Sequence, residues 1–241
     1  MAGLLTVGNT AKLYCLQLLD EAAARAEGEF QIIDLGCGDG RNFVELLRRR
    51  ANVRYTGIEP SRAAAAAARL RLPAAEIIES PAYDVAVGPA DAVVSFSVLE
   101  HVVDRLRYIE AVRANLAPSG RVFLNYDSGH FGPDATFVER TRARAGGLLA
   151  RFGNESRYRA AVREEELRAL IAAASLRIVD DKGFNTELKR AYRDVPEEHV
   201  DAFMQRWLAF ELELSAAGIG YDERLFRTRN LVLEPAARPD R

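Results

Sequence analysis

An apolar run that ends in a glycine-rich turn constrains the fold of this chain more than any other feature. Residues 31–40 read Gln-Ile-Ile-Asp-Leu-Gly-Cys-Gly-Asp-Gly, with glycines at 36, 38 and 40. Three glycines in five positions let the backbone approach a ligand closely and adopt positive φ values that a side chain would resist. Residues 41–50 carry apolar side chains at helical spacing, so the turn opens onto a helix N-terminus. This combination predicts a cradle for a nucleotide-type cofactor.

A second apolar run ends in an acid. Residues 53–58 lead to Glu59, which Pro60 and an alanine-rich helical segment follow. A carboxylate at the tip of the second strand suits a ribose, because it can accept hydrogen bonds from both sugar hydroxyls. We therefore expect Glu59 to bind a cofactor ribose; the alternative is a solvated acid that the dipole of a helix start stabilises. A nicotinamide-dependent dehydrogenase would carry the same two features.

Strands and helices alternate along the chain, which predicts parallel strands joined by right-handed crossovers in a doubly wound α/β sheet. In such a sheet a ligand binds at the carboxyl ends of the strands. After residue 127 the pattern loosens, and we expect a helical lid over 128–162 and a helical insertion over 184–221, all within one domain of residues 1–241. The expected helices are 10–25, 41–50, 61–70, 105–116, 164–174 and 197–217. The first expected strand begins at residue 30, and the others cover 53–58, 75–78, 91–95, 121–125, 176–179 and 225–233.

Composition narrows the function classes. The chain has 241 residues, is 49% hydrophobic and carries a formal net charge of −2, which suits one well-buried domain and argues against a broad nucleic-acid surface. Cys15 and Cys37 cannot form a disulfide framework in a chain of this size, so a reducing cytoplasm fits best. No apolar run reaches membrane-spanning length, and we expect neither secretion nor membrane insertion.

Two further segments identify a family resemblance. Residues 91–103 read Asp-Ala-Val-Val-Ser-Phe-Ser-Val-Leu-Glu-His-Val-Val, and residues 116–126 read Leu-Ala-Pro-Ser-Gly-Arg-Val-Phe-Leu-Asn-Tyr. Together with the glycine turn and the acid-tipped strand, they occur in the order and approximate spacing of the class I S-adenosylmethionine-dependent methyltransferases, which the chain resembles. The resemblance implies a mostly parallel, seven-stranded, Rossmann-like sheet whose last strand is antiparallel. It also implies S-adenosyl-L-methionine as cofactor and S-adenosyl-L-homocysteine as product.

The resemblance assigns most of the cofactor site. Lys12 is similar to a basic residue that meets the cofactor carboxylate in ubiquinone-type O-methyltransferases; a surface lysine is the alternative. Pro81 stands where the usual adenine-binding acid is expected, so Ser80 or the backbone around it is expected to serve instead. Phe96 either packs against the cofactor or belongs to the core. The predicted cofactor-binding residues are Lys12, Asp34, Gly36, Cys37, Gly38, Gly40, Glu59, Pro60, Ser80, Ser95 and Phe96.

Three residues are candidates for catalysis. His101 follows the fourth strand, and an imidazole with its ordinary pKa near 6.5 suits a general base at neutral pH. Tyr126 and His130 follow the fifth strand and are expected at the same mouth, where each could orient the acceptor. Relatives with a divalent metal place two acids and a histidine here, but Ser97 stands where the first acid would be. With two ligands left, we predict no catalytic metal.

The predicted acceptor is a small molecule. The Asn-Pro-Pro-Tyr type of segment that amino-base methyltransferases place after the fourth strand is replaced by residues 95–98, which disfavours nucleic acid. Arginines in the lid are either solvated or receive an anionic or carrier-bound acceptor. The alanine and arginine content is typical of GC-rich bacteria, in which natural-product tailoring methyltransferases are common. A nicotinamide-dependent oxidoreductase and a non-catalytic scaffold of the same fold are the alternatives.

Overall fold

The computed structural model describes residues 10–127, 158, 160–184, 195–218, 226 and 228–236. Most of the predicted lid (128–162) and His130 lie outside these residues, as do parts of the 184–221 insertion. None of the described helices is both long and apolar enough to cross a membrane.

The described strands form one seven-stranded sheet in the order β3-β2-β1-β4-β5-β7-β6. The first five strands are parallel, and β7 runs antiparallel to both of its neighbours, β5 and β6. This arrangement confirms the predicted mostly parallel sheet with an antiparallel last strand. The strands are β1 (Phe30–Leu35), β2 (Val53–Ile58), β3 (Glu76–Ile78), β4 (Ala90–Phe96), β5 (Leu116–Asp127), β6 (Leu176–Phe184) and β7 (Thr228–Pro235).

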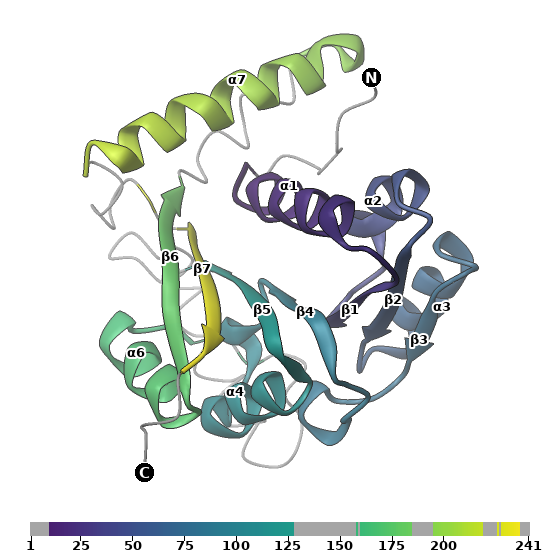
Figure 1. Cartoon of the computed structure of the whole chain (residues 1–241), viewed down its shortest axis with the longest axis vertical. Helices are drawn as coiled ribbons and strands as arrows, with labels where there is room; N and C mark the ends of the chain where they lie inside the picture. The colour runs from purple at the N-terminus through teal and green to yellow at the C-terminus, as the bar shows by residue number, and fades with distance from the viewer. Residues whose placement is uncertain are drawn as a thin grey trace.

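Helices cover both faces of the sheet (Figure 1). One face is covered by α1 (Thr10–Arg25), α2 (Val44–Arg49) and α3 (Arg62–Arg71), and the other by α4 (Arg105–Ala114) and α6 (Glu164–Ala173). A long helix, α7 (Glu197–Ala216), lies beside α1. Three single 3₁₀ turns complete the described elements: η1 (Arg41–Phe43), η2 (Ala82–Asp84) and η3 (Leu99–His101).

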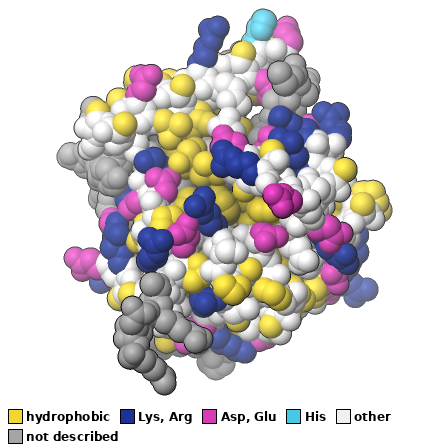
Figure 2. All heavy atoms as spheres, viewed as in Figure 1, with side chains coloured by type: hydrophobic (Ala, Val, Ile, Leu, Met, Phe, Trp, Pro, Cys, Tyr) yellow, Lys and Arg dark blue, Asp and Glu magenta, His cyan; other side chains and the backbone are white. Residues whose placement is uncertain are grey.

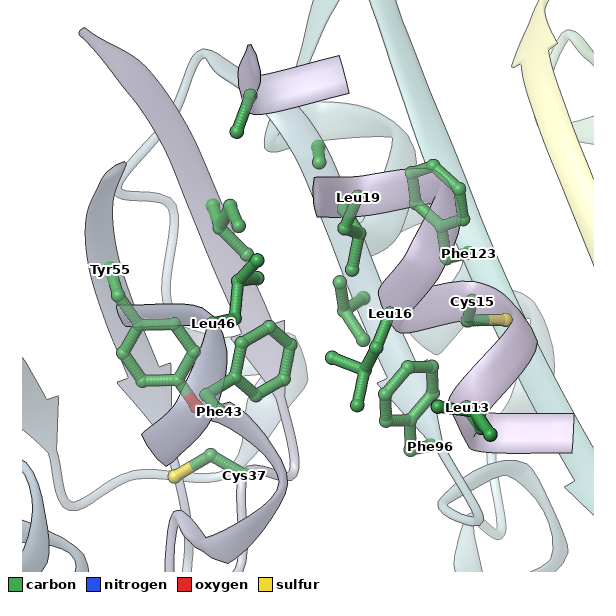
Figure 3. Close-up of a cluster of buried hydrophobic side chains, with 14 of the residues drawn as sticks. Leu13, Cys15, Leu16, Leu19, Cys37, Phe43, Leu46, Tyr55, Phe96 and Phe123 are labelled. Atoms are coloured by element: carbon green, nitrogen blue, oxygen red, sulfur yellow. The ribbon is translucent and has the colours of Figure 1, made fainter. Parts of the chain in front are cut away.

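Each face of the sheet has its own hydrophobic core, because successive strand residues point to opposite faces. Phe96 and Phe123 contribute to the core under α1. Leu124, which directly follows Phe123 on β5, contributes to the core under α4 and α6. Figure 3 shows the first core, in which Phe43 lies between Tyr55, at a ring-centroid distance of 4.7 Å, and Phe96, at 6.1 Å. The helix that follows the glycine turn is thereby packed against two strands.

Two strands are longer than the sequence pattern predicts. β5 begins at Leu116 rather than at residue 121, because Leu116 pairs with Ala90 before the register shifts. β6 continues to Phe184 rather than ending at residue 179, because its polar second half pairs with β7 up to Phe184 opposite Thr228. Pairing with a distant strand satisfies the backbone N–H and C=O groups of these residues. The local sequence does not reveal this pairing.

Polar contacts fasten α7 onto α1. Gln17 donates to Gln205 at 2.7 Å, and Thr10 donates to the buried carboxylate of Glu211. α1 is also tied to the sheet, since Asn230 on β7 donates to the Ala11 carbonyl at 2.6 Å. The first turn of α1 is therefore held from two sides.

Candidate active site

The glycine turn after β1 has the conformation that its composition predicts. Gly36, Gly38 and Gly40 have φ values of +89°, +59° and +74°, all in the left-handed region that favours glycine. A Cβ on Gly36 would collide with Val98, and one on Gly40 would lie 2.8 Å from Leu72 Cδ1, whereas one on Gly38 would meet nothing within 4 Å. Gly36 and Gly40 are thus required by packing. Gly38 faces open space, where a ligand can approach the backbone.

Glu59 is held by the turn itself. The Gly38 N–H donates to Oε2 at 3.0 Å, and the Ser61 N–H donates to Oε1 at 2.8 Å. Each carboxylate oxygen has two acceptor positions, so one on each oxygen remains for a diol. The half-buried Glu59 therefore joins the tips of β1 and β2 in an arrangement that fits a ribose. Pro60, the next residue, is exposed beside it.

Asp34 lies buried at the end of β1. Tyr55 donates a hydrogen bond of 2.8 Å to Oδ2, while the buried Oδ1 has no hydrogen-bond partner in the protein. Burial raises the pKa of Asp34 to about 7, against the opposing effects of the Tyr55 hydrogen bond and the Lys12 charge. An unsatisfied buried acceptor is costly and is typical of a site that a ligand donor or an ordered water completes. This oxygen fits the cofactor that the turn predicts.

Lys12 lies in the first turn of α1 and is half-buried. Its charge lowers the pKa of Asp34, the buried acid at the end of β1. A cation here suits the carboxylate of an amino-acid moiety. The role assigned to Lys12 stays a prediction, but the position of the residue agrees with it.

Cys37 fills the space between the turn and β2. A Cβ on Gly57 would lie 2.7 Å from Cys37 Sγ and 3.0 Å from Ile77 Cδ1. Burial also raises the pKa of the Cys37 thiol, so it stays protonated and packs as a small apolar group. Sequence reasoning missed Gly57, because a glycine inside a strand shows its packing role only when its neighbours are known.

Ser80 lies at the tip of β3, next to Glu59. Its N–H donates to the Glu59 carbonyl at 3.3 Å, and its hydroxyl donates to the Pro81 carbonyl at 3.3 Å. Pro81 then starts the turn η2. The half-buried Ser80 thus lies beside Glu59 at the edge of the cradle, and its role at the adenine end stays a prediction.

Two predicted cofactor residues direct their side chains into the core. Ser95 is fully buried, and its hydroxyl lies 2.7 Å from the Tyr108 hydroxyl, which donates to the Leu35 carbonyl at 3.2 Å. Phe96 is 5% exposed and stacks on Phe43. The Ser95 hydroxyl is therefore used inside the core, and the assignment of Ser95 to the cofactor site stays a prediction. Of the two alternatives for Phe96, its position agrees with the core role. Both side chains support β4 and the glycine turn from within the protein.

Tyr126 also directs its side chain into the core. It is 2% exposed and belongs to the core under α4 and α6, and burial raises the pKa of its phenol. The preceding residue on β5, Asn125, points to the opposite face of the sheet. Tyr126 is therefore a buried core residue, and its role in orienting the acceptor stays a prediction without support from this position.

His101 ends the turn η3 and is half-buried. Its Nδ1 lies 3.1 Å from the Tyr158 carbonyl oxygen. Because a carbonyl only accepts, this contact requires the proton on Nδ1, and in the neutral ring the lone pair is then on Nε2. The geometry therefore gives neutral His101 the tautomer with the proton on Nδ1, and its role as a base stays a prediction.

Arg105 fixes the chain segment that contacts His101. Its guanidinium donates to the carbonyls of Ala160 and Ala161 at 2.9 and 3.0 Å, and to Glu166 at 3.2 Å. The Ala160 N–H in turn donates to the Glu100 carbonyl in η3 at 2.9 Å. Sequence reasoning missed Arg105, since an arginine in a helical first turn looks like a solvated residue.

Metal ligands do not gather in the described part of the chain, where no group of three His, Cys, Asp or Glu side chains could hold an ion. The prediction of a metal-free site remains a prediction. The same holds for His130, which lies outside the described residues.

Comparisons with known proteins identify the family and the fold of the chain. A family model described as a methyltransferase domain matches residues 8–181, more than half of the chain. A trans-aconitate 2-methyltransferase of Paracidovorax citrulli (strain AAC00-1) is 31% identical over 117 residues, which are 47% of this chain and 45% of that protein. The chain thus aligns with less than half the length of this curated relative.

Solved structures share the fold at low sequence identity. The O-methyltransferase of a trans-AT polyketide synthase of Brevibacillus brevis, crystallised with S-adenosyl-L-homocysteine, has a TM-score of 0.58 at 14% identity, covering 93% of this chain and 72% of that one. The cyclase SpnF has a TM-score of 0.57 at 18% identity, covering 92% and 81%. The chain belongs to the methyltransferase-domain family, and its fold is that of the class I S-adenosylmethionine-dependent methyltransferases.

Proposed function

We propose that this protein transfers a methyl group from S-adenosyl-L-methionine to a small-molecule acceptor. The observation that carries the proposal is the cradle, in which Gly38 and Ser61 hold the Glu59 carboxylate beside an open backbone and an unsatisfied Asp34 oxygen. Family membership supports methyl transfer over nicotinamide chemistry. The fold alone would be weak support, because a cyclase shares it.

Each part of the cradle suits one part of the cofactor. Glu59 would hold the ribose, the backbone at Gly38 would lie against the methionyl part, and Lys12 would meet the carboxylate. When bound, S-adenosyl-L-methionine supplies a methyl group on a positively charged sulfur. The protein then has to align the acceptor and remove its proton. The Nε2 atom of His101 is the candidate base.

The acceptor is proposed to be small; the name of the trans-aconitate 2-methyltransferase supports an anionic molecule, and a carrier-bound molecule is the alternative. On the face that Figure 2 shows, hydrophobic side chains gather near the middle, and charges of both signs surround them. A nucleic acid needs a continuous basic surface, which this face does not offer. The methylated atom, O, N or C, is taken up in the next subsection.

Calorimetry and isotope transfer test the proposal. The folded protein should bind both S-adenosyl-L-methionine and S-adenosyl-L-homocysteine, and Gly38→Val should abolish both, since it fills the space at the turn. Gly28→Val, at another glycine with nothing within 4 Å, is the control. If neither compound produces heat with the folded protein, the proposed cofactor binding is refuted. Binding without transfer of a radiolabelled methyl group to any small-molecule probe supports the scaffold alternative.

The role of His101 has its own test. His101→Ala should leave cofactor affinity nearly unchanged and lower turnover by roughly 10²–10⁴-fold, with loss of the pH-rate limb that the base produces. A structural histidine would instead lower thermal stability and reduce turnover only with the folded fraction. An unchanged rate and pH profile in the folded variant excludes His101 as the base.

A further inference from the structure

Ser97 occupies a strained position at the mouth of the site. It directly follows β4 and has φ +57°, in the left-handed region that side chains other than glycine rarely adopt. Its N–H donates to the Asn125 carbonyl at 2.8 Å, and the next residue, Val98, packs against Gly36 of the glycine turn. Strained backbone of this kind is often retained where a side chain must point in a functional direction.

A chain of buried amides leads from α1 to the Ser97 hydroxyl. The Asn230 amide donates to the Ala11 carbonyl at 2.6 Å, Asn125 donates to Asn230 Oδ1 at 2.6 Å, and the Ser97 hydroxyl donates to Asn125 Oδ1 at 3.3 Å. Asn125 and Asn230 are fully or almost fully buried. We name the connection of these four residues the amide relay.

The direction of every hydrogen bond in the amide relay is determined at its far end. Because the Ala11 carbonyl only accepts, Asn230 must place its NH₂ group there and its oxygen toward Asn125. Asn125 then presents NH₂ to Asn230 and also donates to the Arg229 carbonyl at 3.4 Å, which fixes its orientation a second time. The oxygen of Asn125 is therefore left facing Ser97.

This polarity decides what the Ser97 hydroxyl can offer a ligand. A hydroxyl has one hydrogen to donate and two lone pairs to accept with. Its hydrogen faces the Asn125 oxygen, so the lone pairs remain for the site. Ser97 Oγ thus acts as an acceptor at the carboxyl edge of β4, in the loop that His101 ends.

We infer that Ser97 Oγ accepts a hydrogen bond from the methyl acceptor, and that the acceptor therefore carries its nucleophile as an O–H or N–H group rather than as a carboxylate or a carbon. The inference rests on the proposed function and narrows it. A carboxylate has no hydrogen to donate, so its lone pairs would face the lone pairs of Ser97 Oγ. A protic group satisfies Ser97 and is aligned in the same contact. An N–H₂ acceptor keeps a second hydrogen for the base His101, whereas an O–H acceptor has to release Ser97 before His101 takes its proton.

Matched probes and variants test this assignment. Phenol, benzylamine and benzoate share one ring and differ in the group that meets Ser97, and trans-aconitate adds a second carboxylate probe. Their affinities are measured by calorimetry for the protein saturated with S-adenosyl-L-homocysteine, and methyl transfer is measured with radiolabelled cofactor. Ser97→Ala removes the acceptor oxygen. Ser97→Asn tolerates the left-handed backbone and keeps both a donor for Asn125 and an acceptor for the probe.

Ser175 provides the control, because it is an exposed serine with the same backbone strain, at φ +56°, outside the site. The wild type should prefer phenol or benzylamine over benzoate. Ser97→Ala should weaken the preferred probe roughly three- to tenfold with S-adenosyl-L-homocysteine affinity within about twofold, whereas Ser97→Asn and Ser175→Ala should retain the preference.

The assignment would be overturned by a wild-type preference for a carboxylate probe, by binding of none of the four probes, or by a preference unchanged in Ser97→Ala. Equal losses in Ser97→Ala and Ser97→Asn would also contradict it, since size and not polarity would then matter. Failure of the proposed function is separate. It appears as protic probes that bind through Ser97 but receive no methyl group.

Discussion

Tyr55 donates a 2.8 Å hydrogen bond to Asp34 from the neighbouring strand, directly beneath the glycine turn. The phenol stabilises the charged carboxylate, whereas burial of the same carboxyl group favours its neutral form. Burial has the larger effect and raises the pKa of Asp34 to about 7. The carboxyl group at the base of the cradle therefore titrates near neutral pH, and this has a measurable consequence for stability.

Asp34→Asn should change the pH dependence of folding. The Asp34 pKa is higher in the folded protein than the unfolded value of about 3.9, so its ionisation disfavours the folded state increasingly between about pH 4 and 7, and no further above pH 7. Relative to the wild type, the variant should gain roughly 1–3 kcal/mol between pH 5 and pH 8. Urea unfolding at both pH values measures this gain. Glu29→Gln, at an exposed acid, is the control. Parallel pH profiles for Asp34→Asn and the wild type contradict the prediction.

Glu59→Ala should weaken cofactor binding by about ten- to hundredfold, or roughly 1.5–3 kcal/mol, because it removes the acceptor of two ribose hydrogen bonds. Glu59→Gln keeps one oxygen and should lose less. Glu79→Ala, at an exposed acid beyond the end of β3, should bind normally. Calorimetry with S-adenosyl-L-homocysteine measures all three variants. An affinity within about twofold of the wild type for Glu59→Ala, roughly 0.4 kcal/mol, would exclude the ribose role.

Gly57→Ala should destabilise the protein by roughly 1–3 kcal/mol, because the added methyl group would lie 2.7 Å from Cys37 Sγ. Removing that sulfur should make room for it. In a double-mutant cycle, Cys37→Ala should therefore recover part of the loss caused by Gly57→Ala. Thermal unfolding of the four proteins gives the coupling, and purely additive effects argue against this contact. Gly28→Ala, where a Cβ meets nothing within 4 Å, is the control.

Arg105→Met should cost roughly 2–4 kcal/mol of stability, because it leaves the carbonyls of Ala160 and Ala161 without their charged donor. Amide hydrogen exchange at Ala160 should also accelerate, since its bond to the Glu100 carbonyl depends on the same segment. Arg107→Ala is the matched control: this exposed arginine pairs with Asp84, and its loss should change stability by less than about 0.5 kcal/mol. Equal effects of the two variants would show that Arg105 is not the anchor.

Local pattern was sufficient for much of the fold. The predicted bounds of α1 and β2 agree with Thr10–Arg25 and Val53–Ile58, because apolar spacing and turn residues are encoded within each segment. The same holds for the glycine turn and Glu59, where the required chemistry and the backbone conformation are adjacent in the sequence. Such features need no knowledge of distant residues.

Features that depend on distant partners were not predictable. The second half of β6 reads as polar loop sequence until Phe184 is paired with Thr228. Ser95 and Tyr126 were both assigned to the site because they stand near strand ends, but the face to which each points depends on the register of the whole strand. The amide relay joins Ala11, Asn230, Asn125 and Ser97, four residues that no local motif connects.

The contact between Asn230 and the Ala11 carbonyl spans 219 positions of the chain. During synthesis at about 5–20 residues per second, the first helix therefore leaves the ribosome roughly 10–40 seconds before its partner on β7 exists. Over that interval the apolar face of α1 has to be protected in another way, by transient packing on the early strands or by a chaperone. The last strand to be made both completes the sheet and fixes the first helix, so a ribosome that stalls shortly before residue 228 would hold a chain with its cofactor turn already synthesised and its N-terminal helix not yet fastened to β7.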